Sequence, residues 1–147
     1  MKVSDFLTAA DVAIDVRIAN KQQLLRDLAG KAASALSLQA DYVSSALLKR
    51  EDLGSTGMGR GVAIPHARLP LVKKPYGIMT RLKQPIDFEA IDGQPVDLVF
   101  LLLLPAPPET NQLVALAAVA RALKTPETLD RLRRAKNISE IYAAITG

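Results

Sequence analysis

The chain has 147 residues, of which 49% are hydrophobic and 23% are charged, a composition typical of globular proteins. A chain of this length has room for one hydrophobic core, so we expect a single domain over residues 1–147. Its 19 basic and 15 acidic residues give a net charge of +4, which is too small to indicate nucleic-acid binding by itself.

Missing residue types exclude several classes of site. The chain has no cysteine, which excludes disulfide frameworks, thiolate nucleophiles and cysteine-ligated metals. The chain has one histidine, His66, and the absence of a second excludes the usual zinc and non-haem iron sites built on two or more histidines. We therefore expect no metal and no cofactor. The longest apolar run, Leu98 to Leu104, is far shorter than the roughly 20 residues that span a bilayer. With no secretory apolar stretch at the N-terminus, a cytoplasmic protein without membrane insertion is expected.

The first half of the chain predicts helices that lead into a glycine-rich loop. Apolar residues at helical spacing predict a helix from Lys21 to about Leu36, with Asn20 as its N-cap. A second helix is expected from about Ala40 to Glu51. The stretch Gly54–Gly61 then has four glycines in eight residues, which predicts a loop.

Strands and further helices are expected after this loop. Val62–Pro65 is typical of a short strand that Pro65 ends, which would place His66 just past the strand. Tyr76–Leu82 is expected to form another strand. Val96–Leu104, apolar at every position from Leu98, is typical of a central strand covered on both faces.

Three helices are predicted in the last part of the chain. The first opens at Glu109 and Thr110 and runs to about Leu123, the second has Thr125 as cap, and the third follows Asn137. The mixture of elements predicts a single α/β domain, with a mixed β-sheet and helices on its faces.

The segment Gly54–Arg68 carries the strongest chemical signal. It places one imidazole beside glycine-rich backbone, two hydroxyls and arginine side chains. Neutral imidazole is a good nucleophile near neutral pH, and such surroundings suit a dianionic phosphoryl group. The residues therefore predict a phosphohistidine at His66, with a buried, hydrogen-bonded core histidine as the alternative. The segment matches neither the phosphate-binding loop, the dinucleotide fingerprint nor the serine hydrolase motif.

Motifs in this segment and beyond it resemble a known family. They are Leu48–Glu51, Gly54–Gly57, Gly61–His66, Pro85–Phe88 and Asp92–Asp97, followed by the apolar strand to Pro105. Over about residues 4–145 the chain resembles the enzyme IIA family (EIIA, fructose–mannitol type) of the bacterial phosphoenolpyruvate-dependent phosphotransferase system. Within this family it is most similar to the nitrogen-regulatory members.

The resemblance implies roles for individual residues. His66 matches the histidine that accepts a phosphoryl group from an HPr-like carrier (NPr), and Arg50 matches an arginine that steadies the phosphoryl oxygens. Ser55 and Thr56 lie in the matching loop and could donate hydrogen bonds to the phosphoryl group or serve only as caps. Arg68 could bind the phosphoryl group or be a solvated arginine that steers an acidic partner.

One position departs from the family pattern. Many members carry a second histidine at the start of the helix after the central strand, where this chain has Gln112. Glutamine can donate a neutral hydrogen bond to a phosphoryl oxygen or to the imidazole, but it carries no charge. A mechanism that needs a second protonated imidazole is therefore in doubt here.

The sequence leaves three functional hypotheses open. The first is a regulatory phosphocarrier, whose targets would be proteins such as potassium transporters or sensor kinases. The second is a sugar-specific EIIA that passes the phosphoryl group to an EIIB, and the third is a binding module that is never phosphorylated. The basic residues of the stretch Arg121–Lys136 are interpreted as a solvated helical face, because the stretch has no aromatic residue to stack on bases.

Overall fold

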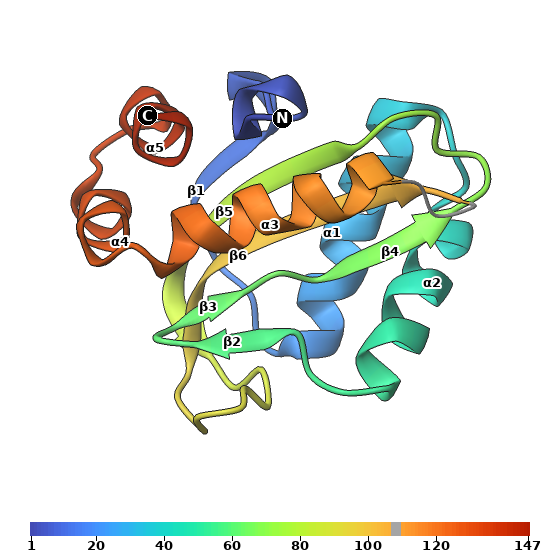
Figure 1. Ribbon diagram of the computed structural model, residues 1–147. Coiled ribbons are helices and arrows are strands. Elements are labelled where there is room, and N and C mark those ends of the chain that lie inside the picture. The colour runs from blue at the N-terminus through green and yellow to red at the C-terminus, as the bar shows by residue number, and fades with distance from the viewer. Residues whose placement is uncertain (107–109) are drawn as a thin grey trace.

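Helices cover both faces of one mixed sheet (Figure 1). The computed structural model describes residues 1–106 and 110–147, with side chains undescribed at positions 110–112. In chain order the elements are η1 (Val3–Asp5) and η2 (Ala9–Asp11), both short 3₁₀ helices, β1 (Val12–Val16), α1 (Lys21–Leu36), α2 (Ala40–Asp52), β2 (Gly57–Gly59), β3 (Val62–Ala63), β4 (His66–Leu69), β5 (Tyr76–Ile86), β6 (Val96–Pro105), α3 (Thr110–Lys124), α4 (Pro126–Arg134) and α5 (Ile138–Thr146).

The sheet is built around β6. Its strand order is β1-β5-β6-β3-β2, and β4 continues beside β6 beyond the end of β3. Strand β6 runs antiparallel to β5 but parallel to β3 and β4, whereas β1 runs parallel to β5. The mixed α/β sheet predicted from the sequence is therefore confirmed.

Side chains of β6 alternate between two hydrophobic cores. Leu98, Phe100 and Leu102 belong to the core that includes residues of α3, α4 and α5. Val99 and Leu101 belong to the other core, which includes residues of α1 and α2. All five are fully buried, which confirms the prediction of a central strand covered on both faces.

Predicted caps account for the starts of two helices. Asn20 accepts a hydrogen bond from the Gln23 amide at 2.9 Å, and Asn137 accepts one from the Glu140 amide at 2.9 Å. Thr125 occupies the N-cap position of α4, but its hydroxyl donates to the Arg121 carbonyl at 3.0 Å instead of capping the helix. The predicted position of the N-cap at Thr125 is therefore correct, but the Thr125 side chain does not cap the helix.

The glycine-rich stretch is more ordered than the predicted loop. Residues Gly57–Gly59 form β2, which pairs antiparallel with β3. Arg60 and Gly61 connect the two strands with φ angles of 58° and 78°. Positive φ at both positions is what a two-residue hairpin turn requires. Most of the stretch is therefore part of a tight hairpin. Its strands are too short, and too rich in glycine, to show the alternation of apolar and polar residues that identifies a strand in a sequence.

The position of His66 also differs from the prediction. Strand β3 ends at Ala63, and His66 is the first residue of β4, which pairs with the same neighbour, β6. Pro65 has no amide hydrogen to give to the ladder, so pairing is interrupted around it. The Pro65 carbonyl accepts from the Leu102 amide at 3.0 Å, which holds the chain beside β6 until pairing resumes. His66 therefore lies at the point where pairing with β6 resumes after the interruption at Pro65.

Strand β1 is absent from the sequence-based prediction, and β5 continues to Ile86 instead of ending at Leu82. Strand β1 has only five residues, and they are unevenly buried. The sequence of β1 therefore shows little of the alternation between apolar and polar residues that identifies a strand.

None of the helices in the described ranges is long and apolar enough to cross a membrane.

Candidate active site around His66

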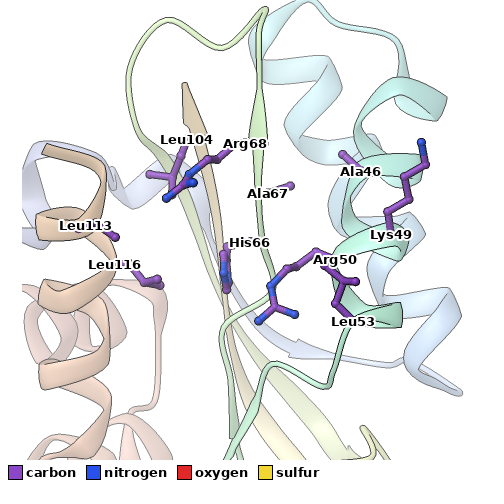
Figure 2. Close-up of a pocket in the computed structure, with 10 residues that line it drawn as sticks. All are labelled: Ala46, Lys49, Arg50, Leu53, His66, Ala67, Arg68, Leu104, Leu113 and Leu116. Carbon is purple, nitrogen blue, oxygen red and sulfur yellow. The ribbon is translucent and has the colours of Figure 1, made fainter. Parts of the chain in front are cut away.

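His66 lies in a cleft between α2 and α3 (Figure 2). The cleft has a volume of about 470 Å³. Its lining comes from α2 and its C-cap residue, β4, the end of β6 and α3: Ala46, Lys49, Arg50, Leu53, His66, Ala67, Arg68, Leu104, Leu113 and Leu116. A second hollow of about 280 Å³ shares His66 and Arg50 with the cleft and adds Ser55 and Thr56. The half-buried imidazole is therefore accessible from the surface.

The imidazole of His66 is held by its own backbone. Its Nδ1 lies 2.9 Å from the Ile64 carbonyl oxygen. A carbonyl only accepts hydrogen bonds, so Nδ1 carries the proton and Nε2 carries the free lone pair. Pro65, between the two residues, keeps Ile64 in extended geometry. The backbone break at Pro65 thus selects one tautomer of the ring.

Burial lowers the pKa of His66 below its ordinary value of 6.5. The positive charges of Arg50 and Arg68 lower this pKa further, while the Ile64 hydrogen bond and the negative charge of Glu51 oppose the shift. The imidazole is therefore neutral at neutral pH, which is the form that acts as a nucleophile.

Arg50 stands in the last turn of α2 and is fixed by a hydrogen bond. Its Nη1 donates to the Gly54 carbonyl oxygen at 2.9 Å. Arg50 and His66 line both hollows, and Figure 2 shows the guanidinium extending from α2 toward the strand that carries His66. The sequence-predicted pair is therefore brought together. A guanidinium in this position can bind phosphoryl oxygens.

Arg68 and Lys49 add to the positive charge of the cleft. Both are exposed, and Arg68 lies two residues beyond His66 on β4. The lining includes no carboxylate among the residues that the structure describes. Within those residues, no group of three histidine, cysteine or acidic side chains could hold a metal ion either. The cleft is thus suited to an anion.

Ser55 and Thr56 have hydrogen-bond partners away from the imidazole. The Ser55 hydroxyl donates to the Phe88 carbonyl at 3.0 Å, and the Thr56 hydroxyl donates to the Glu51 carboxylate. Both residues line the smaller hollow, so they lie near the site. Their partners favour the structural role that the sequence left open beside phosphoryl binding.

Lys21 and Glu51 were missed by the reasoning from sequence. Glu51 accepts a hydrogen bond from the Thr56 amide. The Lys21 Nζ lies 3.0 Å from Glu51 Oε1, and both residues are buried. Each is a charged residue within a predicted helix, where an exposed position is the ordinary expectation. No local pattern indicates that they pair. Gln112 has a side chain outside the described residues, so its role remains a prediction.

Comparisons with known proteins find relatives over nearly the whole chain. The family model described as "Phosphoenolpyruvate-dependent sugar phosphotransferase system, EIIA 2" matches residues 5–147. The "Nitrogen regulatory protein" of Bradyrhizobium diazoefficiens is 41% identical over 145 residues, covering 99% of this chain and 95% of that protein.

Solved structures show the same relationship. The crystal structure of nitrogen regulatory protein IIA-Ntr from Neisseria meningitidis superposes with a TM-score of 0.93 at 32% identity, covering 98% of this chain and 99% of that one. The Escherichia coli mannitol enzyme IIA, solved in complex with phosphorylated mannitol enzyme IIB, shares the fold with a TM-score of 0.78 at 19% identity, covering 95% of this chain and 96% of that one. The chain therefore belongs to the EIIA 2 family of the phosphoenolpyruvate-dependent sugar phosphotransferase system, and nitrogen regulatory proteins are among its relatives.

Proposed function

We propose that this EIIA-type phosphocarrier accepts a phosphoryl group on Nε2 of His66 from the phosphohistidine of an HPr-like carrier (NPr). One observation carries the proposal: Nδ1 of His66 is engaged with the Ile64 carbonyl at 2.9 Å, in a cleft lined by three cationic side chains. The neutral ring thus has one available nitrogen, and the phosphoryl group it receives is met by positive charge.

The transfer exchanges one nitrogen–phosphorus bond for another. The lone pair of Nε2 attacks phosphorus, the nitrogen–phosphorus bond of the donor breaks, and the donor imidazole leaves with that electron pair. The other nitrogen of each ring keeps its proton, so the exchange is symmetric and reversible. Such transfers depend mainly on in-line positioning and charge stabilisation. Arg50, held by the Gly54 carbonyl, and Arg68 supply that charge.

The relatives support a regulatory role for this chain. Nitrogen regulatory proteins match this chain over nearly its whole length. The phosphorylation state of His66 would then be read by target proteins, with potassium transporters and sensor kinases as candidates. The second candidate function is transfer onward to an EIIB, which the complex of the mannitol relative with phosphorylated enzyme IIB favours.

Intact-mass analysis tests the proposal. The chain is incubated with phosphoenolpyruvate, enzyme I and an HPr-type carrier, and we expect one acid-labile phosphoryl adduct that is absent in His66→Ala. Persistent labelling of His66→Ala would refute the site. No adduct on the wild-type chain, with the carrier itself phosphorylated, would favour the unphosphorylated binding module. Loss of the adduct upon adding a purified EIIB would identify the sugar-transport alternative.

A further inference from the structure

A buried ion pair contacts the glycine-rich segment that leads to His66. Lys21 is 7% exposed and Glu51 is 8% exposed, and Lys21 Nζ lies 3.0 Å from Glu51 Oε1. The same Nζ lies 4.5 Å from the ring centroid of Phe88 and 3.7 Å from the exposed Glu89 carboxylate. Removing two charges from water is costly, and apolar residues often stabilise a fold equally well. The pair therefore calls for an explanation other than stability alone.

Both carboxylate oxygens of Glu51 are used on one neighbour. Oε1 accepts from the Thr56 amide at 3.0 Å, and Oε2 accepts from the Thr56 hydroxyl. Lys21 shares Oε1 and so orients the carboxylate toward Thr56. The ion pair thereby fixes the main chain and the side chain of a single residue in the active-site segment.

Hydrogen bonds continue from Thr56 to the imidazole. The Thr56 carbonyl accepts from the Ile64 amide at 3.1 Å. The Ile64 carbonyl, on the same residue, accepts from Nδ1 of His66 at 2.9 Å. A contiguous series of contacts thus joins the buried ammonium group to the ring, passing through Glu51 and Thr56.

Arg50 holds the other end of the same segment. It adjoins Glu51 at the end of α2, and its Nη1 donates to the Gly54 carbonyl at 2.9 Å. The last turn of α2 therefore binds the segment twice, through Arg50 at Gly54 and through Glu51 at Thr56. One helix turn sets both the phosphoryl-binding arginine and the support of the imidazole.

We propose that Lys21 and Glu51 are positioning residues for His66, which hold Thr56 so that the Ile64 carbonyl keeps the ring in its Nδ1–H tautomer with Nε2 available. The inference rests on the proposed function only for its consequence, which is faster phosphoryl transfer. The positioning itself is a property of the unphosphorylated chain. It can therefore be measured whether or not a phosphoryl group is ever accepted.

The tautomer of His66 is the decisive readout. His66 is the sole histidine of the chain, so a two-bond ¹H–¹⁵N spectrum of the full-length protein contains one imidazole. The spectrum is recorded at a pH where the ring is neutral. In the wild type we expect Nδ1 to carry the proton. A merely structural ion pair would leave this distribution unchanged in any variant that folds.

The first variant is the double substitution Lys21→Met and Glu51→Met. It removes both charges together and fills the space with apolar side chains, so no unpaired charge stays buried. We expect the ratio of Nδ1–H to Nε2–H tautomer to fall about fivefold, as for the loss of one ordinary hydrogen bond. The rate of phosphorylation by the carrier should fall at least as much.

The second comparison uses threonine and keeps the ion pair. Thr56→Val removes the hydroxyl with little change of shape and should shift the tautomer in the same direction, whereas Thr56→Ser should restore it. Thr80→Val is the matched control, because Thr80 is 1% exposed and its hydroxyl has no partner among the described residues. Its tautomer ratio should equal that of the wild type.

An unchanged tautomer ratio in the folded double variant overturns the proposal. If that variant does not fold, Thr56→Val decides alone: a shift that Thr56→Ser reverses supports the positioning role, and no shift overturns it. A wild-type chain that accepts no phosphoryl group would refute the proposed function. The tautomer comparison would still decide the positioning role.

Discussion

At the scale of single residues, the site depends on the hydrogen bond between His66 and the Ile64 carbonyl. Pro65 interrupts the pairing beside β6, and the ring turns back to bond the carbonyl two residues earlier. Local backbone geometry therefore fixes the imidazole that we propose as the nucleophile. Arg50 and the exposed Arg68 supply charge around it.

The lowered pKa of His66 gives a prediction in solution. Because the folded chain binds the imidazole proton more weakly than the unfolded chain, the free energy of unfolding should decrease as pH falls from the unfolded value of 6.5 through the lower folded pKa. An NMR titration of the single imidazole should give a pKa below 6.5. His66→Gln should lack this part of the pH dependence of stability. A titration midpoint at or above 6.5 would contradict the burial argument.

Arg50→Ala should slow phosphoryl transfer. Removal of one charged donor at a transferring group costs on the order of 10²-fold in rate. The free energy of unfolding should change by only about 1 kcal/mol, through loss of the bond to the Gly54 carbonyl. Arg26→Ala is the matched control, because Arg26 is exposed on α1 and lines neither hollow. Equal transfer rates for the two variants would exclude the proposed role of Arg50.

At the scale of elements, the hairpin of β2 and β3 is packed too closely at Gly57 to accept a side chain there. A Cβ on Gly57 would lie 2.7 Å from the Cβ of Ala90, so Gly57→Ala should destabilise the fold by about 1–3 kcal/mol. Gly30 in α1 has nothing within 4 Å of an added Cβ. Gly30→Ala should therefore stabilise the fold by about 0.5–1 kcal/mol. Urea unfolding of both variants checks the pair, and equal midpoints would contradict the packing described.

Elements with strong local signals were predicted correctly from sequence. The caps Asn20 and Asn137 and the apolar run of β6 each carry their information in a few neighbouring residues. The hairpin at Gly57–Ala63 and the restart of pairing at His66 depend on the ladder that β6 offers, which is far away in sequence. Such tertiary pairing overrides local propensity.

In the candidate site too, locally encoded features could be predicted from the sequence, and features that depend on tertiary packing could not. The identities of His66 and Arg50 could be predicted from the motif, and the structure places both at one cleft. The pair of Lys21 and Glu51 could not, because their contact arises from the packing of α1 against α2. The Ser55 hydroxyl likewise finds its partner far away in sequence, at the Phe88 carbonyl, whereas the partner of the Thr56 hydroxyl is the nearby Glu51.

At the scale of the whole molecule, Arg81 joins the sheet to the C-terminal helices. From β5 it donates to the carbonyls of Leu132 at 3.0 Å and Ala135 at 2.6 Å, at the end of α4, and it pairs with Asp15 at 3.1 Å. The guanidinium thus satisfies carbonyls that the helix end leaves without partners. The α4–α5 unit is tied by this residue to β1 and β5.

Arg81→Met should therefore lower the free energy of unfolding by about 2–4 kcal/mol, since charged hydrogen bonds at partly buried carbonyls are lost. Urea unfolding measures the change. Lys83→Met, an exposed position on the same strand, is the control and should stay near the wild-type midpoint. A loss of equal size in both variants would show that Arg81 does not join the sheet to the helices in the way described.

The most direct test of the central claim is the site of phosphorylation on the ring. The phosphorylated, ¹⁵N-labelled chain has one histidine, so phosphorus–nitrogen coupling reports on a single imidazole. The hydrogen bond from Nδ1 to the Ile64 carbonyl predicts that phosphorus is bonded to Nε2 and that Nδ1 keeps its proton. Phosphorus bonded to Nδ1 would contradict the account, because that nitrogen would first have to leave the Ile64 carbonyl.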